Sequence, residues 1–227
     1  MKKAHRINAV IVGVLFIVTM LLGMLDAYFV APSLNVHLSS LVQIQGTILL
    51  GVFSVFFMAI GIVGIATTLF PVVRRQSEAI AITYVSFRIV ECFLLTLGAI
   101  LYLFLLTTSK VNFNSNFLVG ALDTQLPQIA VNIKLDAYQL GMVVLGMGSM
   151  LLCYSFYQSQ VIPRWLSIWG LVGYLFLFLS AIFSLLGIVD TMNGVGSLMY
   201  IPGGLWELFA FPIWLFAKGF NTPLEQK

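Results

Sequence analysis

The chain has 227 residues, of which 60% are hydrophobic and only 8% are charged, and its formal net charge is +3. Soluble domains are about 45–50% apolar and about 25% charged, so the 11 basic and 8 acidic side chains of this chain are too few to cover a soluble domain of its size. The composition excludes a soluble enzyme, a nucleic-acid-binding protein and a disordered chain. It predicts an all-α polytopic membrane protein in contact with the lipid bilayer.

The N-terminal segment carries Lys2, Lys3 and Arg6 ahead of an apolar run at 7–25. A signal peptide has the same charge pattern, but its apolar core is usually about 7–15 residues long. Because the run in this chain is longer than that, we expect a retained first membrane helix. A cleaved signal peptide is the alternative.

Six apolar segments are long enough to cross a bilayer as helices, because a spanning helix needs about 20 apolar residues. They predict a single transmembrane domain, a bundle of six helices at 7–30, 41–70, 79–106, 132–158, 165–189 and 200–218. Pro71 is expected to end the second helix, and Pro212 to kink the sixth. Residues 107–131 form the longest predicted loop, with the apolar stretch 117–122 at the membrane interface.

Lysine and arginine are distributed unequally between the two sides of the predicted bundle. With the N-terminus in the cytoplasm, the outer side holds only Lys110 and Lys134. The inner side holds eight basic residues: Lys2, Lys3, Arg6, Arg74, Arg75, Arg164, Lys218 and Lys227. Cytoplasmic loops carry such an excess of positive charge, so we expect both termini to be cytoplasmic.

Three charged residues are predicted to lie near the middle of the membrane. Counting about 1.5 Å per residue along the third and sixth spans places Arg88, Glu91 and Glu207 near the midplane of a hydrocarbon core about 30 Å thick. Arg88 and Glu91 are three positions apart and therefore share one face of a helix, with Tyr84 one turn away. Because charges at this depth are costly, these four residues are the predicted polar binding site.

Two interpretations of this cluster are open from the sequence. In the structural one, Arg88 pairs with a carboxylate and locks the third helix to the sixth, in a non-transporting scaffold, sensor or accessory subunit. In the functional one, the cluster lines a cavity that binds or moves a small solute, a lipid or a proton. Two carboxylates beside one arginine leave a net charge of −1, which favours the functional interpretation.

Further polar residues are predicted near the outer ends of the spans. Asp26, Asp136 and Gln139 are a candidate rim of an outward vestibule, although such residues are more often only interfacial. No GxSxG, HExxH or P-loop motif is present, and the cysteines and histidines lack metal-ligand spacing. We therefore expect no cofactor and no metal, and an intramembrane enzyme is the least favoured interpretation.

Several segments resemble one known family. They are the run YVSFRIVE at 84–91, the run VIPRWLSIWGLVG at 161–173, and the later pattern Pro202-Gly203, Glu207, Trp214-Leu215 and Lys218-Gly219-Phe220. By these motifs the chain resembles the bacterial domain-of-unknown-function 4386 family over nearly its whole length. The resemblance implies a six-helix protein of the bacterial plasma membrane and implies no reaction.

Overall fold

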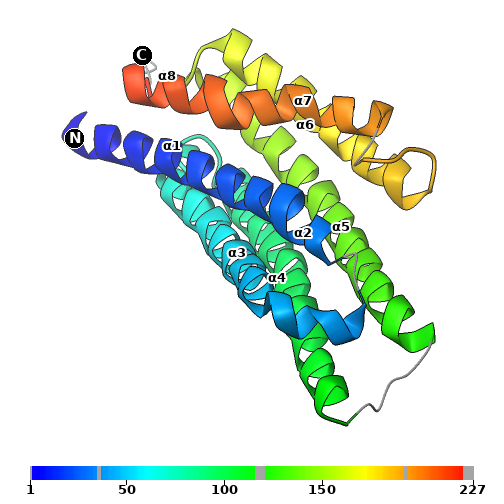
Figure 1. Ribbon diagram of the computed structural model, residues 1–227. Coiled ribbons are helices and arrows are strands. Elements are labelled where there is room, and N and C mark those ends of the chain that lie inside the picture. Colours follow the sequence, from blue (N-terminus) through cyan, green and yellow to red (C-terminus); the bar gives the residue numbers. More distant parts are fainter. Residues whose placement is uncertain (1, 35–36, 116–120, 192–193, 222–227) are drawn as a thin grey trace, which may run out of the picture.

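The computed structural model describes residues 2–34, 37–115, 121–191 and 194–221, and every regular element in them is helical (Figure 1). The elements in chain order are α1 (Lys2–Leu25), the π-helical turn η1 (Asp26–Val30), α2 (Ala31–Ser33), the 3-10 helix η2 (Leu38–Ile44), α3 (Gln45–Val73), α4 (Glu78–Ser115), α5 (Ala121–Ser159), α6 (Arg164–Leu185), α7 (Val195–Leu205), the π-helical turn η3 (Trp206–Ala210) and α8 (Phe211–Ala217).

Six helical stretches in these residues are long and apolar enough to cross a membrane. They are Arg6–Ser33, Leu38–Val73, Glu78–Val111, Gln125–Ser159, Arg164–Leu185 and Gly196–Ala217. Their outward faces carry large exposed apolar side chains such as Phe57 and Phe93, which a bilayer solvates. The predicted fold class, an all-α bundle of six membrane helices, is confirmed.

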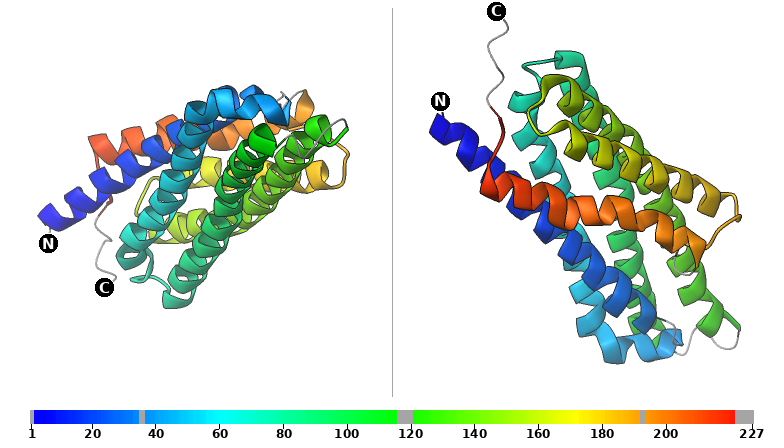
Figure 2. Two further views of the ribbon diagram at one scale, coloured as in Figure 1. Left: turned by 60° about the horizontal axis from the view of Figure 1, so that its bottom comes forward. Right: turned by 90° about the horizontal axis from the view of Figure 1, so that it is seen from above.

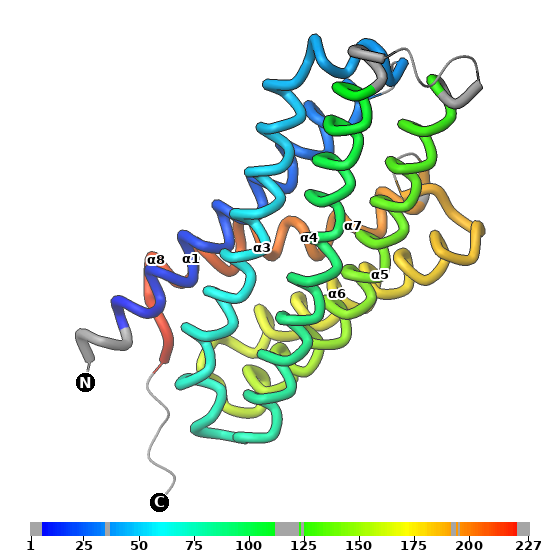
Figure 3. Tube along the Cα trace, turned by 90° about the horizontal axis from the view of Figure 1, so that it is seen from below, coloured from blue at the N-terminus to red at the C-terminus, as the bar shows by residue number. Residues whose placement is uncertain are grey.

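The six spans follow one another around the bundle, and the last returns to the first. α1 packs on α3, α3 on α4, α4 on α5, α5 on α6 and α6 on α7, and α8 lies beside α1 (Figure 2). α1 runs along α3, whereas the α7–α8 helix crosses α3, α4 and α5 obliquely (Figure 1). Both termini lie at one end, which we call the terminal end, and η2 and the α6–α7 connection lie towards the other, the far end (Figure 3).

Two apolar cores hold the bundle together. In the first, Trp206 stacks on Phe211 with ring centroids 4.4 Å apart, and Phe16 meets both rings edge-on. The Trp206 indole N–H donates a hydrogen bond to the Leu166 carbonyl at 2.8 Å, so this large side chain is buried without an unpaired donor. The second core lies towards the far end, where η2 packs on α3, α4 and α5 and η1 packs on α3. Its buried members include Val30, Leu34, Leu38, Leu41, Ile48, Leu105 and Ala130.

Close approach of α6 and α7 depends on glycine. A Cβ atom on Gly173 would lie 2.9 Å from the Cα atom of Gly203, so any side chain at this position would push the two backbones apart. Small residues at helix contacts allow such packing within membranes. The contact holds the α7–α8 helix against α6 on the side where Glu207 lies.

Two predicted boundaries are wrong. Residues 107–131 are not a long loop, because α4 runs to Ser115 and α5 begins at Ala121. These helical extensions are stabilised by η2, with the Ser109 hydroxyl donating a hydrogen bond to the Leu38 carbonyl, so tertiary packing outweighs the low helix propensity of their Thr, Ser and Asn residues. Of the predicted interfacial stretch, 117–120 lies outside the described residues.

Pro71 does not end its helix, which continues to Val73. A proline inside a helix removes one backbone hydrogen bond. The helix ends within the following turn, where the Arg74 N–H still donates to the Phe70 carbonyl at 2.9 Å. The lost bond therefore falls in the last turn, where the cost is small.

Candidate functional site

The predicted mid-membrane cluster, which consists of Tyr84, Arg88, Glu91 and Glu207, begins with three side chains of α4. The guanidinium of Arg88 donates from Nη1 to Glu91 Oε2 at 2.8 Å and from Nε to the hydroxyl oxygen of Tyr84 at 3.0 Å. Only 4% of the Arg88 side chain and 1% of the Glu91 side chain are exposed. The predicted common face of these residues is therefore present, and the ion pair lies within a single helix.

Glu207 has different surroundings from Glu91. Its Oε1 accepts a hydrogen bond from the Tyr174 hydroxyl on α6 at 2.7 Å. No basic side chain of the described residues forms a salt bridge with Glu207, although Arg88 and Glu91 are close enough to interact with it electrostatically. Glu207 also remains partly exposed. Arg88 therefore pairs with Glu91, and no ion pair between Arg88 and Glu207 links the third span to the sixth.

Glu207 lies in a stretch of widened helix. In η3 the Phe211 N–H donates to the Trp206 carbonyl, five residues back, and Pro212 follows directly. Proline cannot donate to the carbonyl four residues before it, and its ring crowds that carbonyl, so a π-helical turn accommodates it. Asp26 begins a similar turn, η1, which ends just before Pro32. Such turns are frequent at functional sites.

A second buried cluster joins three elements that are distant in sequence. Lys134 Nζ of α5 donates to Asp26 Oδ2 of η1 at 2.5 Å and to the Tyr102 hydroxyl oxygen of α4 at 2.6 Å. The Tyr102 hydroxyl in turn donates to Asp26 Oδ1 at 2.7 Å. Each charge thus has two partners, and the Lys134 ammonium also lies 4.6 Å from the centroid of the Tyr102 ring.

This cluster corrects two sequence-based expectations. Asp26 was expected on an outward rim and Lys134 among the outer charges, but their side chains are only 11% and 9% exposed. The aliphatic chain of lysine can be buried while its ammonium reaches a polar partner. The available signal was that an acid and a base lay at similar depth in two different spans, which often indicates an intramembrane pair.

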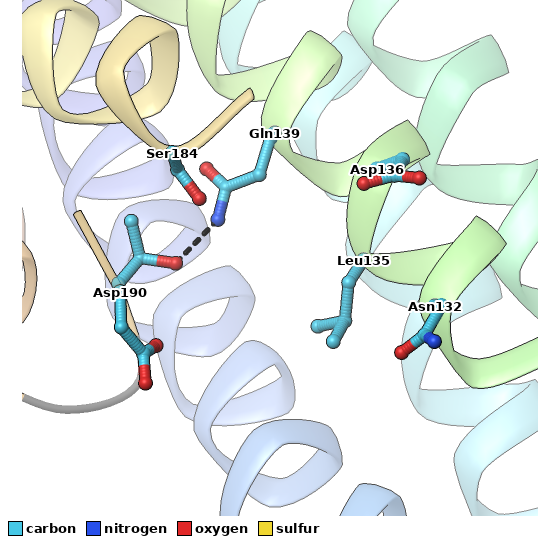
Figure 4. Close-up of a pocket in the computed structure, with 7 residues that line it drawn as sticks. Asn132, Leu135, Asp136, Gln139, Ser184 and Asp190 are labelled. Atoms are coloured by element: carbon cyan, nitrogen blue, oxygen red, sulfur yellow. Dashed lines mark hydrogen bonds between the residues drawn. The ribbon is translucent and has the colours of Figure 1, made fainter. Parts of the chain in front are cut away.

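The other two candidate rim residues meet at the far end. Asp136 and Gln139 of α5 line a pocket of about 180 Å³ together with Asn132, Leu135, Ser184, Asp190 and Thr191 (Figure 4). Asp26 does not line this pocket, so the predicted three-residue rim is divided between two places. Gln139 itself is buried, and its amide is fixed by hydrogen bonds on both sides.

Six apolar helices that surround buried, hydrogen-bonded charges define a multi-pass integral membrane protein. A family model described as a domain of unknown function, DUF4386, matches residues 11–219, and the chain belongs to this family. The matched stretch contains all residues of both buried clusters. No curated protein and no solved structure matches the chain.

Proposed function

We propose that this membrane protein binds or moves a small solute at its mid-membrane cluster, with Glu207 taking up the proton or the cationic group. The observation that carries the proposal is that Glu207 has a hydrogen bond from Tyr174 but no salt bridge with any described basic residue. An unpaired carboxylate is costly within a membrane. A proton or a bound cation removes that cost, so the site is stable when it is occupied.

The remaining residues have supporting roles in this proposal. Arg88 neutralises Glu91, and Tyr84 holds the guanidinium in place through its hydrogen bond to Nε. The electrostatic field of this pair still reaches Glu207, because Arg88 interacts with both carboxylates. The net charge of the cluster therefore changes when Glu207 takes up or releases a proton or a cation.

A second candidate function is a scaffold, sensor or accessory subunit in which buried charges only stabilise the bundle. It is favoured by the Asp26–Lys134–Tyr102 cluster, which ties η1, α4 and α5 together. The Arg88–Glu91 pair does not act in this way, because both residues belong to α4. The scaffold interpretation therefore accounts for the second cluster and leaves Glu207 without a role.

Chemical modification of carboxyl groups tests the role of Glu207. N,N′-dicyclohexylcarbodiimide is an apolar reagent that adds to protonated carboxyl groups within membranes. We expect it to modify Glu207 in preference to Glu91, because Glu91 is 1% exposed and paired with Arg88. Mass spectrometry of peptides from the treated protein in lipid nanodiscs measures the site of addition.

Two variants serve as controls for this reaction. Glu207→Gln is expected to abolish the adduct, whereas Glu78→Gln is expected to retain it, because Glu78 lies in the exposed pair with Arg74 at the terminal end. No adduct on Glu207 in the folded protein, or equal modification of Glu91, would contradict the proposed role and favour the scaffold.

We also propose that the membrane is the plasma membrane of a bacterial cell and that both termini are cytoplasmic. Arg74 and Arg75 lie at the terminal end in the turn after α3, and Arg164 lies there as the first residue of α6. At the far end, Lys134 is buried in an ion pair, so Lys110 is the one exposed lysine or arginine of the described residues there. This charge difference supports the assignment.

Cysteine labelling tests this orientation. In a variant whose Cys92 and Cys153 are replaced by alanine, Lys110→Cys is expected to react with a membrane-impermeant maleimide added to intact cells. Arg75→Cys is expected to react only after the membrane is permeabilised. The opposite pattern would reverse the orientation. Gel detection of the labelled protein measures both reactions.

A further inference from the structure

The pocket at the far end has walls from three parts of the chain. α5 supplies Asn132, Leu135, Asp136 and Gln139, the end of α6 supplies Ser184, and the connection after α6 supplies Asp190 and Thr191. In Figure 4 the connection faces α5 across the pocket. The volume of about 180 Å³ is far above the roughly 10–15 Å³ that accommodates one water molecule, so a small organic molecule fits.

The walls are held in position by a buried amide. Gln139 is 4% exposed, and its Nε2 donates to Thr191 Oγ1 at 2.5 Å. Its Oε1 accepts a hydrogen bond from the Tyr200 hydroxyl of α7 at 2.8 Å. One side chain therefore ties α5 to the connection and to α7, and the width of the pocket is set before any ligand enters.

The lining selects for positive charge. Six of the seven lining residues are polar, two of these are aspartates, and none is lysine, arginine or histidine. Asp136 is exposed and makes no salt bridge within the described part of the chain. The amide of Asn132 and the hydroxyl of Ser184 supply further hydrogen-bond acceptors beside the carboxylates.

We propose that this pocket binds a small primary ammonium cation, with Asp136 on one wall and Asp190 on the other as its counter-charges. A primary ammonium has three donors, which match carboxylate, amide and hydroxyl acceptors. A quaternary ammonium has no N–H donor and is usually recognised by an aromatic cage, whereas none of the seven described residues that line this pocket is aromatic. A diamine carries two such groups, one for each carboxylate.

A metal ion fits this geometry less well. Calcium requires six to eight oxygen ligands at about 2.3–2.6 Å, and only two of the described lining residues are carboxylates. Among the described residues, no group of three or more histidine, cysteine, aspartate or glutamate side chains is placed to hold a metal. The ammonium site is also separate from Glu207, which does not line the pocket.

Calorimetric titration with putrescine tests the proposal on the full-length protein in nanodiscs of zwitterionic lipid. We expect saturable binding with one putrescine per chain, and weaker binding as salt is added. Asp136→Asn is expected to weaken it by at least about tenfold, and because Asp136 is exposed this variant should fold. Glu78→Gln at the terminal end is the matched control and should bind as the wild type does.

The other arms of the titration separate the alternatives. Choline is expected to bind much more weakly than putrescine, and Glu207→Gln is expected to keep the putrescine affinity of the wild type. Calcium binding without putrescine binding, equal affinity for choline, or no saturable binding would overturn the proposal. Loss of binding in Glu207→Gln but not in Asp136→Asn would place the cation at the mid-membrane cluster instead and would equally overturn it.

Discussion

Replacing Lys134 with methionine is expected to lower the free energy of unfolding by about 3–5 kcal/mol, the range found when one partner of a buried ion pair is removed. Methionine fills a similar volume, so the loss arises mainly from charge. The Asp26 side chain, which is 11% exposed, is left with only its hydrogen bond from Tyr102. The unfolding transition of the purified protein in detergent micelles, followed by circular dichroism, measures the change.

A double variant and a surface pair provide the controls. Asp26→Asn combined with Lys134→Met removes both charges and is expected to recover a large part of the lost stability, which a double-mutant cycle quantifies. Arg74→Met breaks an ion pair whose side chains are both 57% exposed, and its effect should stay within about 1 kcal/mol. If Lys134→Met lowers the free energy of unfolding no more than Arg74→Met does, the cluster does not hold η1, α4 and α5 together.

Replacing Arg88 with methionine is expected to have the second large effect, again about 3–5 kcal/mol. Glu91, which is 1% exposed, would remain buried without its counter-charge. The hydroxyl oxygen of Tyr84 would also lose the hydrogen bond that Arg88 donates to it. Combining Arg88→Met with Glu91→Gln removes the stranded charge and should be less destabilising than Arg88→Met alone. The same unfolding measurement applies.

Glu207→Gln separates the two interpretations of the mid-membrane cluster. Glu207 has no salt bridge among the described residues, so this substitution alters only its hydrogen bond with Tyr174. It should therefore lower the free energy of unfolding by only about 1 kcal/mol. A destabilisation as large as that of Arg88→Met would assign Glu207 to the structural framework. A small effect on stability together with loss of the carbodiimide adduct would leave Glu207 free to act as a binding group.

The two acidic side chains in π-helical turns illustrate how a local sequence feature prepares a site. Asp26 and Glu207 each lie in a turn that ends directly before a helix carrying proline at its start, Pro32 in one case and Pro212 in the other. The sequence predicted a disturbance of the helix near Pro212. It did not specify a widened turn, because the pattern of backbone hydrogen bonds depends on how the neighbouring helices pack.

The sequence by itself determined the features that depend on neighbours along one helix. Six apolar runs predicted six spans because the length of a membrane helix is set by the thickness of the hydrocarbon core. Arg88 and Glu91 were predicted on one face because a spacing of three residues brings two side chains together in any α-helix. The depth of Glu207 was predicted from the rise per residue of an α-helix.

Only the tertiary structure decided which residues of different helices meet. Lys134 pairs with Asp26 because the fold brings these parts of α5 and η1 together, and their similar depth in two spans did not by itself specify that they meet. The connection after α6 brings Asp190 to the pocket that Asp136 lines, and η2 packs on the extensions of α4 and α5 that the sequence predicted as a loop. The physical reason is the same in each case: contacts between helices depend on packing in three dimensions, whereas hydropathy and residue spacing report on one helix at a time.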